Sequence, residues 1–215
     1  MFANTKLDDA VRRAIDLLES LGGEFNSLAE VLNGEIEKLA RGKLKEVCPT
    51  IIAVSDGSWD CQEFHYPGFI QNFELRAKNK KKATAYLSYQ VNFCPPPRIP
   101  MLLMVGIDDD IGGFGDSDTP NVWDCNTFLH DDDDWKLKDG FLITYRDSLN
   151  SSNWFDRCWM FAVPLTLLTS VDDVKRLVIE PLVDLLSLKD IADLKAIKKR
   201  HSSLYQPIRS GGKRA

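Results

Sequence analysis

The sequence predicts an α+β fold, in which a central, mainly antiparallel β-sheet of about five to six strands is flanked by helices from both ends of the chain. Three observations predict it: apolar residues at helical spacing near the N-terminus, strict alternation in the middle, and further helical stripes after residue 170. A chain of 215 residues that is 44% hydrophobic can bury a core as one domain. We expect that domain to span 1–200, with a mobile basic tail at 201–215.

The first segment, 5–42, is predicted to form a helical hairpin. Thr5-Lys6-Leu7-Asp8 and Ser27-Leu28-Ala29-Glu30 both have the pattern of a capping box, which marks the start of a helix. Gly22-Gly23 separates two apolar stripes and is expected to end the first helix. The stripes consist of Leu7, Val11, Ala14, Leu18 and Leu21, then Leu28, Leu32, Ile36 and Leu39.

The sheet region is predicted at 47–164. The clearest strand lies within 83–93, where Leu87, Tyr89 and Val91 alternate with polar residues. This period of two indicates a sheet with one covered face and one wetter face. Further strands are expected within 50–57, 69–78, 101–107, 140–147 and 158–165.

Helices are predicted again at 170–200. Ser170 precedes an acidic first turn and is expected to cap the first of them. Pro181 predicts a kink or a restart, because proline lacks the backbone N–H that a helix interior needs. Ser187 is expected to cap the last helix, which carries Ile191, Leu194 and Ile197 on one face.

The charges are unevenly distributed along the chain. Residues 1–100 are neutral, residues 101–160 carry a net charge of −9, and residues 161–215 carry +4. An acidic middle segment attracts a basic partner and repels nucleic-acid phosphate, so it disfavours direct nucleic-acid binding. The alternative is that acidic loops only keep the protein soluble.

Three other features of the sequence bear on the cellular location of the protein. No apolar run is long enough to cross a membrane, and the acidic, amphipathic N-terminus does not resemble a signal peptide. The 5 cysteines are widely spaced and odd in number, which is typical of reduced thiols. We therefore expect a cytoplasmic protein without a membrane partner; the oligomeric state is left open.

A short motif occurs twice, as WDCQEFH at Trp59–His65 and as WDCNTFLH at Trp123–His130. Two cysteines and two histidines form a complete tetrahedral set for zinc, although the usual Cys-x-x-Cys pair is absent. The candidate ligands are Cys61, His65, Cys125 and His130. Core packing or an internal duplication would also explain the repeat, in which case we expect no cofactor.

The function predicted first is therefore a non-enzymatic binding or regulatory protein, such as an inhibitor, an immunity-type protein or a decoy. No Gly-x-Ser-x-Gly elbow or phosphate-binding glycine loop is present. The expected partner-binding residues are Asp108, Asp109, Asp110, Asp116, Asp118, Asp131, Asp132, Asp133 and Asp134. The alternative is a metal-dependent hydrolase, such as a nuclease, built on Asp60, His65, Asp124 and His130.

Overall fold

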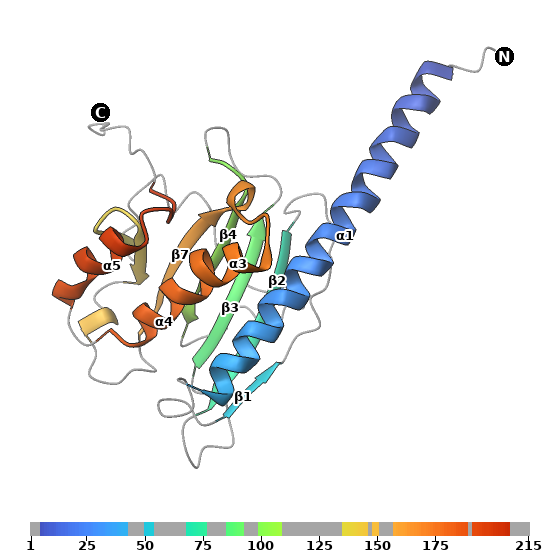
Figure 1. Cartoon of the computed structure of the whole chain (residues 1–215). Helices are drawn as coiled ribbons and strands as arrows, with labels where there is room; N and C mark the ends of the chain where they lie inside the picture. The colour runs from blue at the N-terminus through green and yellow to red at the C-terminus, as the bar shows by residue number, and fades with distance from the viewer. Residues whose placement is uncertain are drawn as a thin grey trace, which may run out of the picture.

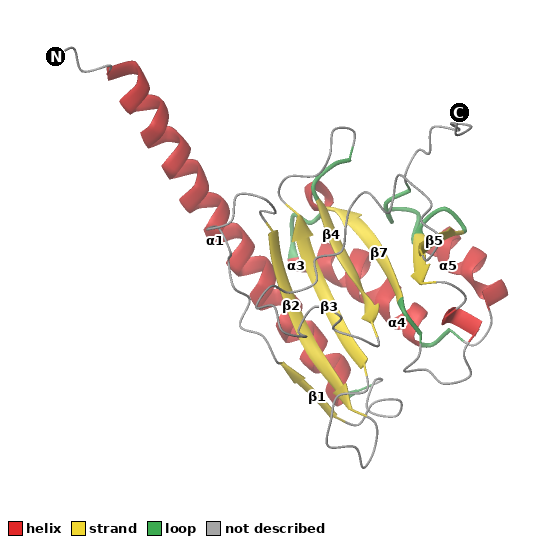
Figure 2. Cartoon of the chain, turned by 180° about the vertical axis from the view of Figure 1, so that it is seen from behind, coloured by secondary structure: helices red, strands yellow, loops and turns green. Residues whose placement is uncertain are grey.

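The computed structural model of the chain is a single sheet with helices packed on one of its faces (Figure 1). It describes residues 5–42, 50–53, 68–76, 85–92, 99–108, 135–145, 148–150, 157–188 and 191–206. Seen from behind in Figure 2, the strands lie in front of the helices. The predicted α+β class is confirmed.

Seven strands form the sheet in the order β1-β2-β3-β4-β7-β6-β5, and every neighbouring pair is antiparallel. Their bounds are β1 Thr50–Ala53, β2 Gly68–Arg76, β3 Ala85–Asn92, β4 Leu102–Asp108, β5 Trp135–Lys138, β6 Leu142–Tyr145 and β7 Trp159–Pro164. The sequence did not predict β5, because a strand of four residues with two lysines carries little apolar signal.

The helices come from both ends of the chain. The N-terminal helix is α1, Thr5–Arg41. The C-terminal set is α3 Val171–Val174, η5 Lys175–Ile179, α4 Glu180–Leu186, η6 Ile191–Asp193 and α5 Leu194–Arg200. Two further short 3₁₀ turns are η2 Ser148–Asn150 and η4 Leu165–Leu167.

The helical hairpin predicted for 5–42 is wrong: α1 is one continuous helix of 37 residues that runs through Gly22-Gly23. Glycine inside a helix costs only about 1 kcal/mol relative to alanine, which strong helix formers on both sides offset. No proline interrupts this segment, so nothing removes a backbone donor.

The main core lies between the sheet and the helices. Leu87 and Tyr89 of β3 meet Leu32 and Ile36 of α1 in this layer, and all four side chains are at most 1% exposed. The C-terminal helices complete it with Leu182, Leu185 and Leu194. The alternation predicted along β3 therefore places its apolar residues on the helix side.

The helix after Ser170 continues past Pro181 without a break in the chain's helical path. A five-residue π turn, η5, immediately precedes α4, in whose first turn Pro181 lies. A π turn widens the backbone and so accommodates the missing N–H of proline. The predicted interruption thus takes the form of a π turn. Ser170 caps α3 as predicted, accepting a hydrogen bond from the Asp173 N–H.

The mobile tail was predicted to begin at residue 201, which is too early. His201 and Leu204 are buried, and the Tyr205 N–H donates a 2.8 Å hydrogen bond to the Ala162 carbonyl of β7. Residues 201–206 thus extend the packed domain, because the apolar Leu204 and Tyr205 reach a strand. Residues 207–215 lie outside the described part of the chain.

Candidate functional site

The residues that the sequence proposed as a site lie almost entirely outside the described part of the chain. This holds for both catalytic and zinc-binding sets, and for every partner-binding aspartate except Asp108, whose backbone ends β4. The residues concerned are Asp60, Cys61, His65, Asp109, Asp110, Asp116, Asp118, Asp124, Cys125, His130, Asp131, Asp132, Asp133 and Asp134. Their roles remain predictions.

The two ends of the acidic stretch 109–134 are nevertheless fixed by the sheet. This stretch holds nine aspartates and neither lysine nor arginine. It leaves the sheet at Asp108, which pairs with Tyr86 of β3, and re-enters at Trp135, which pairs with Tyr145 of β6. Because β7 and β6 lie between β4 and β5, the strands that it joins are about 14 Å apart.

Cationic residues lie on β5, where the acidic stretch re-enters the sheet, and on α5. The Lys198 ammonium donates a 2.7 Å hydrogen bond to the Asp139 carbonyl, which holds α5 against the β5–β6 turn. That turn needs Asp139 and Gly140, since both have positive φ. We define the basic edge as Lys136, Lys138, Lys195, Lys198, Lys199 and Arg200. In the sequence the lysines after 194 look like an ordinary helix end, and only the fold brings α5 to β5.

The sheet face turned away from the helices carries buried polar side chains in β2 and β3. Asn72, Ser88 and Gln90 are at most 5% exposed, and the Ser88 hydroxyl donates to the Asn72 side-chain oxygen at 2.5 Å. On the same face, Arg76 forms an ion pair with Glu74. The prediction of a wetter face is therefore wrong for Ser88 and Gln90. Alternation alone identifies the face but not its burial.

A second polar cluster joins α4 to the end of α5. His201 Nε2 lies 2.8 Å from Asp184 Oδ2, and Arg200 donates to the same oxygen at 2.5 Å. The imidazole is only 7% exposed. A His–Asp pair can orient a catalytic base, but among the described residues no serine or cysteine is hydrogen-bonded to this one. Its arrangement fits a role in holding the two helices together.

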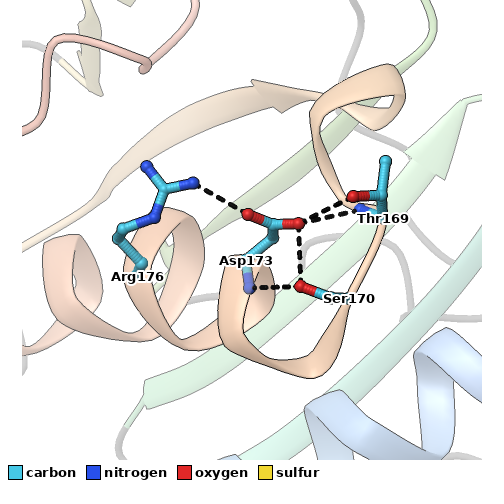
Figure 3. Close-up of polar contacts among 4 residues, drawn as sticks. All are labelled: Thr169, Ser170, Asp173 and Arg176. Atoms are coloured by element: carbon cyan, nitrogen blue, oxygen red, sulfur yellow. Dashed lines mark hydrogen bonds and ion pairs between the residues drawn. The ribbon is translucent and has the colours of Figure 1, made fainter.

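A third cluster surrounds Asp173 at the start of α3 (Figure 3). Its carboxylate accepts hydrogen bonds from Arg176 at 2.8 Å, from the Thr169 hydroxyl at 2.8 Å and from the Ser170 hydroxyl at 2.8 Å. These donors, Arg176 foremost, lower the pKa of Asp173 to about 2. The cluster caps the N-terminus of α3, and the Asp173 carboxylate stays ionised at neutral pH.

Within the described ranges, no group of three or more histidine, cysteine, aspartate or glutamate side chains is arranged to hold a metal ion. In the same part of the chain, no helix is long and apolar enough to cross a membrane. Comparisons of the chain with protein-family models, with curated proteins and with solved structures found no significant match.

Proposed function

We propose that this chain is a non-enzymatic binding or regulatory protein whose acidic middle segment, residues 101–160, engages a basic partner. An inhibitor, an immunity-type protein or a decoy would act in this way. The observation that carries the proposal is the charge segregation, since residues 109–134 hold nine aspartates and no lysine or arginine. A segment of one sign raises the association rate of an oppositely charged partner.

The sheet supports this proposal by anchoring both ends of the acidic stretch. One end follows Asp108, the last residue of the central strand β4, in which residues 102–107 are buried. The other end precedes Trp135, the first residue of the edge strand β5. A partner that binds between these anchors meets a chain whose ends are already ordered. Less conformational entropy is then lost on binding than with an untethered acidic peptide.

The basic edge supports a defined orientation. A cationic partner is attracted by residues 109–134 and repelled by the cations of β5 and α5, including Lys136 and Lys199, which are both exposed. Opposite charges at neighbouring places suppress the wrong docking orientations. We therefore expect the partner to lie on the β4 side of the acidic stretch.

The test uses low-mass poly-L-lysine as the probe and titrates it into the full chain at several salt concentrations. Neutralising Asp131, Asp132, Asp133 and Asp134 to asparagine should weaken binding by about tenfold and lower its salt dependence. The matched control neutralises four exposed acids elsewhere, namely Glu37, Asp172, Glu180 and Asp193. Equal losses in the two variants would show that only net charge matters and would contradict a dedicated segment.

A second candidate function, a metal-dependent hydrolase, rests on the repeated Trp-Asp-Cys motif. Asp60 and Asp124 stand directly before the two cysteines, and His65 and His130 close the two copies. Carboxylates and imidazoles are the groups that activate a metal-bound water for hydrolysis. Stoichiometric metal together with phosphodiesterase turnover would favour this candidate over the binding function.

A further inference from the structure

The segment that follows α5, residues 201–206, lies against β7, and we call it the strap. In Figure 1 it comes directly after α5, at the red end of the coloured chain. His201 and Leu204 are buried, whereas Ser202 is exposed. The Leu204 N–H donates to the His201 carbonyl at 3.2 Å, so the strap begins as a tight turn rather than as a continuation of the helix.

Strand β6 covers only part of the edge of β7 that faces it. The two strands pair through two residues of β7, Trp159 and Met160. Strand β6 begins at Leu142, directly after the turn from β5, so it does not extend along residues 161–164. On its other edge β7 is paired with β4 along its whole length. One edge of β7 therefore continues beyond β6 without another strand of the described sheet beside it.

The strap occupies this open part of the edge. Every second residue of an antiparallel strand points its backbone N–H and carbonyl to the same side. The Cys158 carbonyl accepts the Tyr145 N–H from the β6 side at 3.1 Å. Two positions further in this series of alternate residues, the Ala162 carbonyl accepts the Tyr205 N–H of the strap at 2.8 Å. The series ends at Pro164, which has no N–H to offer to another strand.

The side chains of the strap alternate about the sheet as those of a strand do. Leu204 is 4% exposed and belongs to the main core between the sheet and the helices. Tyr205, the next residue, packs against an apolar cluster on the opposite face, which includes Met104, Met160 and Ala162. Successive side chains that point to opposite faces are typical of a strand. The strap therefore takes the place of a strand at this edge and joins the apolar clusters of both faces.

The start of the strap is held by α4. His201 Nε2 lies 2.8 Å from Asp184 Oδ2, and the imidazole is buried. Because Asp184 belongs to α4, the strap reaches from the helix layer to the edge of β7. It is thus fixed at both ends, by a side chain at His201 and by the backbone at Tyr205.

We propose that the strap protects this edge of β7 from pairing with an extended segment of another chain. An open strand edge readily pairs with other molecules, and folded proteins prevent this by covering the edge or by placing proline on it. Both devices are present here, since the strap covers Ala162 and Pro164 follows it. When the strap is displaced, the edge fits an extended segment in which an aliphatic residue precedes an aromatic one, as Leu204 precedes Tyr205.

The first experiment displaces the strap in the full chain with Leu204→Asp, which places a carboxylate in the main core. Ser202→Asp adds the same charge at an exposed position of the strap and is the matched control. Sedimentation velocity at several micromolar concentrations measures the mass of each variant. We expect Leu204→Asp to form larger species as its concentration rises, and the control to sediment as the wild type does. The same behaviour in both variants, whether association or its absence, would overturn the proposal.

A second variant separates pairing at the edge from aggregation through an exposed core. Ala162→Pro, added to Leu204→Asp, removes an N–H that points to the strap and not to β4. If the larger species form by strand addition, the double variant should return to the wild-type mass. Association that persists undiminished would come from exposed apolar side chains and would contradict the proposal. Neither experiment involves the acidic stretch, so both are independent of the proposed function.

Discussion

The phenolic hydroxyl of Tyr89 in β3 donates a 2.9 Å hydrogen bond to the side-chain oxygen of Asn33 in α1. Tyr89 is 1% exposed, and burial raises its pKa above the usual range, so the hydroxyl is protonated and can donate at neutral pH. The hydrogen bond adds a directional contact to the apolar packing of α1 on the sheet.

Removing that hydroxyl with Tyr89→Phe should lower the free energy of unfolding by about 1 kcal/mol, because the amide of Asn33 loses a partner in a half-buried place. Urea denaturation measures this change. A double-mutant cycle with Asn33→Ala separates the hydrogen bond from other effects of the two substitutions. Strictly additive losses would show that the two side chains do not interact.

The cap around Asp173 should make stability depend on pH in the acid range. Its pKa is about 2 in the folded protein against an ordinary value of 3.8, so the carboxylate stabilises the fold above about pH 4 and loses this effect as the pH falls through 2. Wild type and Asp173→Asn should therefore differ at neutral pH and converge near pH 2. Urea denaturation across this range tests the expectation.

The matched control for that substitution is Asp172→Asn. Asp172 is also in the first turn of α3, but its side chain is 95% exposed and lies 3.8 Å from Lys175 in a weak ion pair. Its replacement should lower the stability at neutral pH less than Asp173→Asn does, since it removes only this weak ion pair. A similar loss in both variants would point to the helix dipole rather than to the hydrogen bonds of Asp173.

Two glycines should respond oppositely to substitution by alanine. A Cβ at Gly106 in β4 would lie 2.1 Å from the Trp159 carbonyl oxygen of β7, so Gly106→Ala should destabilise the sheet by about 3 kcal/mol or prevent folding. A Cβ at Gly34 in α1 would meet nothing within 4 Å, so Gly34→Ala should raise stability by about 1 kcal/mol. Thermal unfolding compares them, and a tolerated Gly106→Ala would contradict the close approach.

The pairing of His201 with Asp184 should contribute to the docking of α5. His201→Ala removes a buried ring and its contact with the carboxylate, and should lower the free energy of unfolding by about 2 kcal/mol. Ser202→Ala, at the exposed neighbouring position, is the control and should change it by less than about 0.5 kcal/mol. Indistinguishable variants would show that the pair is unimportant for stability.

The metal content of the chain, purified without chelator or affinity metal, decides the role of the repeated motif. The binding function proposed above predicts no stoichiometric zinc in the wild type, and no change in stability on adding chelator. Zinc bound in equal amount to the protein, and lost in Cys61→Ala and Cys125→Ala, would instead make the motif a ligand set. The hydrolase candidate would then lead.

Sequence patterns predicted the strands well because the helix-side face of the sheet is apolar, so Leu87, Tyr89 and Val91 alternate with polar residues. These patterns failed where a short local signal, such as a pair of glycines, was outweighed by the residues on either side of it. Gly22-Gly23 looked like a helix end, yet apolar spacing on both sides carries α1 through it. The burial of Gln90 was not predictable, because alternation shows which face a residue shares and not what covers that face.

The proposed site was less accessible to sequence reasoning than the fold. The acidic stretch was evident from composition, but the basic edge depends on α5 meeting the β5–β6 turn, as the Lys198–Asp139 hydrogen bond shows. Residues 139 and 198 lie far apart in sequence, and no periodicity links them. Contacts between residues this far apart depend on the order of the strands in the sheet, which cannot be predicted from the pattern of a single sequence.

The order of elements along the chain has a consequence for synthesis on the ribosome. All seven strands of the described sheet precede α3, α4 and α5, whose residues Leu182 and Leu185 help to cover it. As the chain emerges, β1 to β4 can pair as a meander while the apolar surface of Val105 and Phe161 still awaits its cover. Nascent chains stalled before residue 171 would therefore present a sheet whose apolar face is covered by α1 but not by the C-terminal helices, and would attract chaperones.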